Sequence, residues 1–226
     1  MRAVVLAAGD GGRPAHASAL PKPLVPLHGR PLIDYTLDAL VAAAVHDVVV
    51  ITGYRAAEVQ AGVEAAAPLG LDLAFVSNPR FEDGASYSLR AARDSAADEP
   101  FLLTMADHLL SAELIERLLD TAGEDPPSSY VGADFAPRDP AYVDVATKLA
   151  VTAAGRVVTI GKEIPVWSAL DTGAFVVAPT AWPVIDTAPE NCELSTIFGE
   201  LARRGELYAA DVTGGFWYDV DTAADL

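Results

Sequence analysis

Apolar residues follow two different patterns along the first half of the chain. Four short segments are almost wholly apolar, which is typical of strands in a parallel sheet that is covered on both faces. The longer segments between them carry apolar residues at helical spacing. The predicted strands are 1–8, 47–53, 71–78 and 101–107, and the predicted helices are 31–45, 55–67, 86–97 and 111–122. This alternation predicts an α/β fold with a doubly wound, mostly parallel sheet.

The pattern changes after about residue 122, where the turn-rich segment EDPPSS begins. Shorter strand-like segments then dominate, and Ala154–Gly155 predicts a hairpin turn between two of them. We expect one domain over 1–226, in which 123–226 is a small β-rich subdomain appended to the sheet of 1–122. The last residues, DTAADL, look like a first helical turn, so we expect the chain to be part of a longer polypeptide. The later predicted strands are 130–135, 144–151, 156–163, 170–178, 207–212 and 216–221, and a helix is predicted at 192–205.

Composition excludes several classes of protein. No apolar run approaches the roughly 18 residues that span a bilayer, so we expect no membrane segment. A formal net charge of −17 argues against a surface that binds nucleic acid. The single cysteine, Cys192, excludes an internal disulfide bond and indicates a cytoplasmic protein. The sequence carries no signal for the oligomeric state.

A glycine-rich loop follows the first predicted strand, at the edge of the sheet where open α/β folds bind ligands. Gly9, Gly11 and Gly12 let backbone N–H groups approach phosphate oxygens. Arg13 adds a guanidinium group that can make a bidentate contact, and Lys22 adds a compact ammonium group. The spacing matches neither a Walker A motif nor the dinucleotide fingerprint. The loop therefore predicts a phosphate site of another kind, and the alternative is a plain linker.

Two groups of carboxylates stand at predicted strand ends. Asp107 closes the fourth strand within MADH, and Asp219 and Asp221 lie two apart in FWYDVD, on one face of a strand. Mg²⁺ prefers one or two carboxylates together with phosphate oxygens and water. The sequence does not choose between Asp219 and Asp221, because Asp221 is also a natural helix N-cap. For His108 the sequence leaves two alternatives, which are a structural hydrogen bond and a role in the site.

The glycine loop and the PKPL turn that follows it resemble the signature of the sugar-phosphate and alcohol-phosphate nucleotidyltransferases. This resemblance implies a Rossmann-like nucleotidyltransferase fold whose loop wraps a nucleoside triphosphate, with Arg13 and Lys22 holding the phosphates. It also implies that Mg²⁺ is bound by Asp107 with Asp219 or Asp221. Pro14 departs from the family pattern of a large apolar residue after the arginine. The implied loop contacts come from Leu6, Ala7, Ala8, Gly9, Gly11 and Gly12.

Two further segments resemble binding regions of the same family. The segment NPRFEDGASYSL is similar to the part that lies against the base, which implies contacts from Asn78, Gly84 and Ser86; Ser86 is alternatively a helix N-cap. The second half is similar to the acceptor pocket, and surface lysines and a tight turn are the alternatives there. The implied acceptor residues are Lys148, Lys162, Asp171, Thr172 and Gly173.

The combination MxDH, ATK, GKE, DTGxF and WxDxDT is most similar to one branch of this family. That branch contains the CTP:inositol-1-phosphate cytidylyltransferases and the cytidylyltransferase domain of bifunctional fosfomycin-pathway enzymes, which act on 2-hydroxyethylphosphonate. The resemblance implies a Mg²⁺-dependent enzyme that transfers CMP from CTP to a small phosphate or phosphonate, often fused to a second enzyme. The alternatives are a hexose-1-phosphate nucleotidyltransferase that uses UTP or dTTP, and a catalytically inactive nucleotide sensor.

Overall fold

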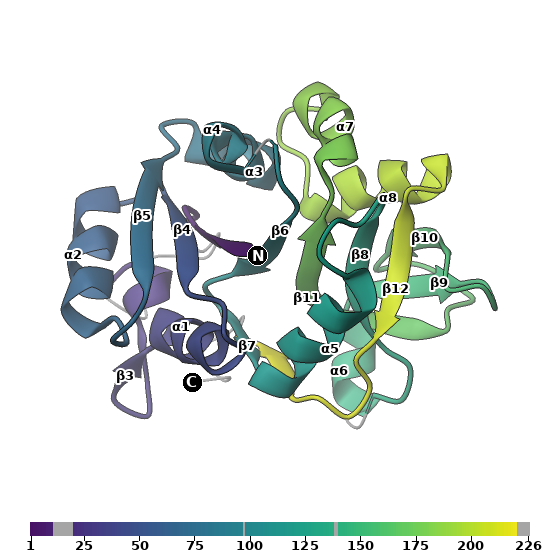
Figure 1. The fold of residues 1–226 in the computed structure, drawn as a ribbon, viewed down its shortest axis with the longest axis horizontal. Helices are drawn as coiled ribbons and strands as arrows, with labels where there is room; N and C mark the ends of the chain where they lie inside the picture. Colours follow the sequence, from purple (N-terminus) through teal and green to yellow (C-terminus); the bar gives the residue numbers. More distant parts are fainter. Residues whose placement is uncertain (11–19, 97, 138–139, 221–226) are drawn as a thin grey trace.

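The computed structural model describes residues 1–10, 20–96, 98–137 and 140–220. Within these ranges nine strands form one sheet, and helices cover both of its faces (Figure 1), so the predicted α/β fold is confirmed. None of the helices in the described ranges is long and apolar enough to cross a membrane. Along the sheet the strands are β10 (Val157–Gly161), β9 (Lys148–Val151), β11 (Ala169–Val177), β6 (Phe101–Met105), β1 (Arg2–Ala7), β4 (Asp47–Thr52) and β5 (Asp72–Ser77), with β8 (Ser129–Asp134) beside β11 and β12 (Leu207–Asp211) beside β8.

The strand β1 lies at the centre of the parallel half, between β4 and β6. Its alternate residues enter two separate cores: Ala3 and Val5 face one set of helices, and Val4 and Leu6 face the other. Burial on both faces explains why this strand is apolar without interruption. The first set is α1 (Leu32–Ala42), α2 (Ala56–Ala66) and α5 (Ala112–Ala122), and the second is α3 (Ala85–Ala91), α4 (Arg93–Ala96), α7 (Trp182–Thr187) and α8 (Leu194–Arg204).

The second half of the chain extends the same sheet. Strand β11 pairs antiparallel with β6, β8 pairs antiparallel with β11, and β12 runs parallel to β8. The stacked rings of Phe175 on β11 and Phe198 on α8, with centroids 3.9 Å apart, fasten this part to its covering helix. Strands β9 and β10 form the predicted hairpin, whose turn contains Gly155 at a φ of 78°. The β-rich part is therefore continuous with the central sheet.

Several element predictions need correction. The predicted strand 144–151 begins as the helix α6 (Pro140–Val145), because a chain that enters at a proline is predisposed to start a helix. The predicted helix 86–97 divides at Ala92 into α3 and α4. Helix α7 and two short ribbons were not predicted; the ribbons pair β2 (Pro26–Leu27) with β3 (Arg30–Pro31), and β7 (His108–Leu110) with β13 (Trp217–Asp219). The expected helical turn at 221–226 lies outside the described residues.

Ser111 fixes the start of α5 and ties it to the chain before β13. Its Oγ accepts hydrogen bonds from the backbone N–H groups of Leu114, at 3.3 Å, and Phe216, at 3.1 Å. We expect Ser111→Ala to lower the free energy of unfolding by about 1 kcal/mol, measured by urea denaturation. Ser111→Asp keeps an accepting oxygen and is expected to retain most of this stability. Equal stability of the wild type and the alanine variant would contradict the capping role.

Candidate functional site

A cleft of about 490 Å³ opens at the carboxyl ends of β1 and β6. Its position follows from the parallel pairing of these strands, which brings both strand ends to one edge of the sheet. The backbone N–H of Ala106 donates to Leu6 O at 3.0 Å and holds the two ends together. Among the described residues, the cleft is lined by Leu6, Ala7, Gly9, Asp10, Lys22, Pro23, Ala85, Ala106, Asp107 and Glu193.

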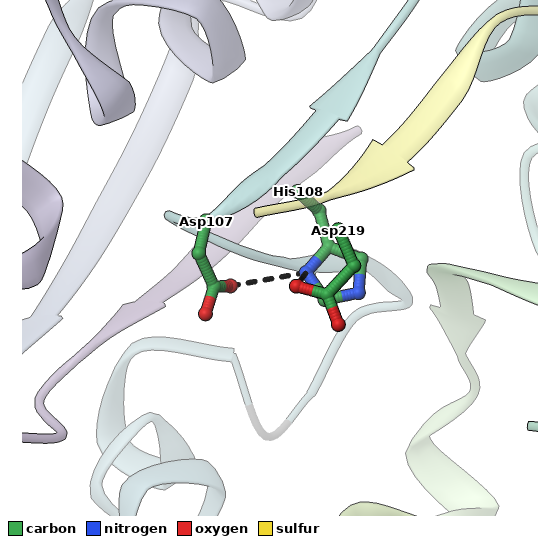
Figure 2. Close-up of side chains that lie close together, drawn as sticks. All are labelled: Asp107, His108 and Asp219. Carbon is green, nitrogen blue, oxygen red and sulfur yellow. Dashed lines mark hydrogen bonds and ion pairs between the residues drawn. The ribbon is translucent and has the colours of Figure 1, made fainter. Parts of the chain in front are cut away.

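The ribbon formed by β7 and β13 brings two distant segments of the chain together beside this cleft. Strand β7 begins directly after Asp107, and its first residue, His108, is the register partner of Asp219. The backbone N–H of Val220 also donates to Asp107 O at 3.0 Å. Figure 2 shows the side chains of Asp107, His108 and Asp219 converging from these two segments. The predicted proximity of Asp107 and Asp219 is therefore present in the structure.

The three side chains form a compact cluster, in which one ligand atom of each lies within 4.8 Å of the others. His108 Nδ1 is 3.0 Å from Asp107 Oδ1 and 3.8 Å from Asp219 Oδ1. The other carboxylate oxygen of Asp107 accepts from Lys22 Nζ at 2.5 Å. Asp107 thus contacts both Lys22, which follows the glycine-rich segment, and His108 of the ribbon.

Burial and these contacts act in opposite directions on the pKa values of the cluster. Burial alone raises the pKa of Asp107, but the hydrogen bond and charge of His108, with those of Lys22, outweigh it and lower the pKa. Burial alone lowers the pKa of His108, but Asp107, Asp219 and Asp171 outweigh it and raise the pKa. Burial raises the pKa of Asp171 to about 6, although the N–H of Gly173 favours its ionised form. Asp107 is therefore ionised at neutral pH.

In the predicted acceptor tripeptide Asp171–Gly173, Gly173 lies against the ring of His108. The N–H of Gly173 donates to Asp171 Oδ1 at 2.8 Å, and Thr172 Oγ1 donates to the carbonyl of Gly132 at 2.9 Å. Gly173 has a φ of 77°, and a Cβ placed there would lie 2.0 Å from His108 Cδ2. Only glycine meets both conditions at this position.

The two lysines predicted for the acceptor pocket are not among the residues that line the cleft. Lys148 is buried, and its Nζ donates to the carbonyls of Ala146, at 3.3 Å, and Lys162, at 3.0 Å. The side chain of Lys162 is exposed. These contacts fasten the start of β9 to the segment after β10. A role in acceptor binding stays a prediction for both residues.

The three residues predicted to contact the base are not among the residues that line the cleft. The side chain of Asn78 donates to Ser88 Oγ and accepts from the N–H of Arg80, while Ser86 is buried with Oγ 3.4 Å from the carbonyl of Pro189. Gly84, at a φ of 96°, is the N-cap of α3, so the alternative that Ser86 caps this helix is wrong. Ala85, between Gly84 and Ser86, reaches the cleft.

Sequence reasoning missed Asp10 and Glu193 as lining residues. Glu193 comes from the N-cap of α8, and it reaches the cleft because the preceding segment folds back on Gly84, where the N–H of Asn191 donates to Asp83 O at 2.8 Å. No local sequence signal announces such a long-range contact. Ala8, also predicted, is buried at the end of β1 and is not a lining residue. Gly11, Gly12, Arg13 and Asp221 lie outside the described residues.

The donor set matches what a hard divalent cation requires. Asp107 and Asp219 each direct carboxylate oxygens into one small region at the margin of a cleft. Carboxylate oxygens are the side-chain ligands that Mg²⁺ prefers, with phosphate oxygens and water completing its coordination. These two residues therefore form a candidate site for a divalent cation beside a space large enough for an organic phosphate.

Comparison with known proteins shows the family to which this chain is similar. Residues 3–162 match the family model described as "MobA-like NTP transferase domain". A "Bifunctional IPC transferase and DIPP synthase" of Rubrobacter xylanophilus is 34% identical over 232 residues, which is 99% of this chain and 50% of that protein. A "CMP-5'-(3-aminopropyl)phosphonate synthase" of Streptomyces rubellomurinus is 38% identical over 122 residues, 52% of this chain and 19% of that protein.

The fold is also similar to that of a solved enzyme. The inositol-1-phosphate CTP transferase from T. maritima superposes with a TM-score of 0.85 at 25% identity, covering 100% of this chain and 91% of that one. By contrast, the chain spans between 42% and 50% of the length of the curated relatives named "Bifunctional IPC transferase and DIPP synthase".

Proposed function

The chain belongs to the MobA-like NTP transferase family, and from this premise we propose that it is a cytidylyltransferase. The proposed reaction transfers CMP from CTP to a small phosphate or phosphonate and releases pyrophosphate. The observation that carries the proposal is the contact of Lys22 with Asp107, beside Asp219, at the mouth of the cleft. A lysine and two carboxylates, brought together from three separate segments of the chain, suit the joining of two anions.

In the proposed mechanism, an oxygen of the acceptor attacks the α-phosphorus of CTP in line with the leaving pyrophosphate. One P–O bond forms as the α–β P–O bond breaks, and the electron pair of that bond leaves on pyrophosphate. A phosphate or phosphonate oxygen is already ionised near neutral pH, so the site needs no general base. Alignment and charge neutralisation are then the main catalytic tasks. Lys22 would neutralise the triphosphate, and we expect Arg13 to assist it.

We propose that Asp107 and Asp219 hold Mg²⁺. A cation bound there would reduce the repulsion between the two anionic reactants. The ionised state of Asp107 and the convergence of both carboxylates support this role. For the second carboxylate we prefer Asp219 to Asp221, because Asp219 faces His108 and Asp107 across the ribbon.

The acceptor is proposed to be similar to inositol 1-phosphate. The similarity in fold to an inositol-1-phosphate CTP transferase extends over the whole chain and supports this choice. The match to a phosphonate synthase over about half of the chain supports a small phosphonate as the second candidate. A second catalytic domain on the same polypeptide stays a prediction.

A substrate panel tests the proposal. Purified protein with Mg²⁺ is incubated with each of CTP, UTP, dTTP, GTP and ATP, and with one of three acceptors: inositol 1-phosphate, 2-hydroxyethylphosphonate or glucose 1-phosphate. Released pyrophosphate is then measured. We expect CTP with inositol 1-phosphate to give the fastest release, and EDTA to abolish it. Preference for UTP or dTTP with glucose 1-phosphate would replace the proposal by the hexose alternative. Nucleotide binding without pyrophosphate release would favour the sensor.

A further inference from the structure

The ring of His108 lies beside both carboxylates, and its two nitrogens have different surroundings. Nδ1 faces Asp107 and Asp219, while the opposite edge of the ring lies against Gly173. A Cβ on Gly173 would be 2.4 Å from His108 Nε2, so the backbone of this glycine packs directly against that edge of the ring. The side chain of His108 is only 13% exposed, which leaves the ring little freedom to turn.

The hydrogen bond to Asp107 defines what Nδ1 can do. An ionised carboxylate has no hydrogen to donate, so the hydrogen in the 3.0 Å contact must reside on Nδ1. A ring nitrogen that carries a hydrogen in the ring plane has no lone pair for a metal ion. Nε2 lies on the edge that faces Gly173, whose N–H donates to Asp171. The geometry therefore favours a donor over a metal ligand.

The backbone around His108 is also held in place. The carbonyl of His108 accepts from Thr36 Oγ1 on α1 at 3.1 Å, and Thr36 is fully buried. The strand pairing with Asp219 fixes the other side of the residue. By contrast, the second oxygen of Asp107 contacts Lys22, whose long side chain has many rotamers. His108 is the more rigid of the two partners of Asp107.

We propose that His108 is a positioning residue, which donates from Nδ1 to Asp107 and, seated on Gly173, holds Asp107 and Asp219 in the arrangement that binds a divalent cation. The inference rests on the proposed metal site. In it, His108 orients the two carboxylates before the metal ion binds. Carboxylates that bind a metal usually need such a partner to fix their orientation. In this interpretation Gly173 acts on the metal only through the imidazole ring.

Direct binding of Mn²⁺, followed by the electron paramagnetic resonance signal of the free ion, tests this without turnover. We expect His108→Ala to weaken Mn²⁺ binding by about 10- to 100-fold. His108→Asn places an amide near the position of Nδ1 and is expected to recover most of that loss. Circular dichroism checks that each variant is folded. Equal affinities of the wild type and the alanine variant, or absence of Mn²⁺ binding by the wild type, would overturn the proposal.

Gly173 provides an independent measurement. We expect Gly173→Ala to weaken Mn²⁺ binding in the wild type, because the new Cβ displaces the ring, but to have little further effect in the His108→Ala background. Additive losses would overturn the proposal. So would nitrogen hyperfine coupling that shows His108 bonded directly to Mn²⁺. If Mn²⁺ binding depends on His108 but CTP is not consumed, only the proposed reaction fails.

Discussion

Asp107→Asn is expected to lower kcat/KM for CTP by about 10³-fold, the largest loss from any single substitution that we propose. The change keeps the shape of the side chain but removes the charge that faces both His108 and Lys22. It should also weaken Mn²⁺ binding, since a neutral amide is a poorer ligand than a carboxylate. Steady-state pyrophosphate release and Mn²⁺ titration measure the two effects on one protein preparation.

A matched control separates the site from general loss of charge. Asp186 lies on α7, where it pairs with Arg93 at the surface, away from the residues that line the cleft. Asp186→Asn also removes one carboxylate charge, and we expect its kcat/KM to stay within about twofold of wild type, as for most surface substitutions. Full activity in a folded Asp107→Asn variant would remove the basis for the metal site.

Lys22→Ala is expected to lower kcat by at least about 10²-fold through loss of one charged transition-state contact. In contrast to Asp107→Asn, it should leave Mn²⁺ affinity unchanged or higher, because the ammonium group that contacts Asp107 is gone. Lys22→Arg keeps the charge but widens it into a planar fork, so we expect only partial activity. The decisive comparison is therefore activity against Mn²⁺ affinity in the same variant.

The exposed Arg204 on α8, which pairs with Glu200, supplies the control for this substitution. Arg204→Ala removes a cation from the surface and is expected to retain wild-type kcat. Wild-type turnover by Lys22→Ala, with normal folding, would contradict the role of this lysine in phosphate neutralisation.

The parallel half of the fold could be predicted because each local pattern there agrees with its surroundings. The apolar run of β1 reflects burial on both faces, and α5 begins at a serine that accepts from the N–H of Leu114. Helix α6 was missed, because Asp144 and Val145 lie within a segment whose pattern favours a strand. The antiparallel pairing of β11 with β6 could not be predicted from the sequence either, since strand order depends on long-range packing.

The candidate site could be predicted only in part, for a similar reason. Lys22 and Asp107 lie within short motifs whose chemistry can be recognised locally. In the structure Lys22 Nζ is 2.5 Å from Asp107 Oδ2. The role that we assign to His108 depends instead on Gly173 and Asp219, which reach it from other strands. Likewise, Ser86 carries a plausible hydroxyl, yet the helix that bears it turns that group toward Pro189.

The ribbon formed by β7 and β13 determines when the acidic cluster can form during translation of the chain. Its second strand, Trp217–Asp219, is synthesised after every other strand of the described chain, whereas β1, β4, β5 and β6 leave the ribosome early. A nascent chain could thus complete its nucleotide-facing sheet while still lacking one of the two acidic groups. The cluster closes only when these residues dock on His108–Leu110, so we expect catalytic competence to arise abruptly once Trp217–Asp219 have left the ribosome, rather than gradually as the sheet forms.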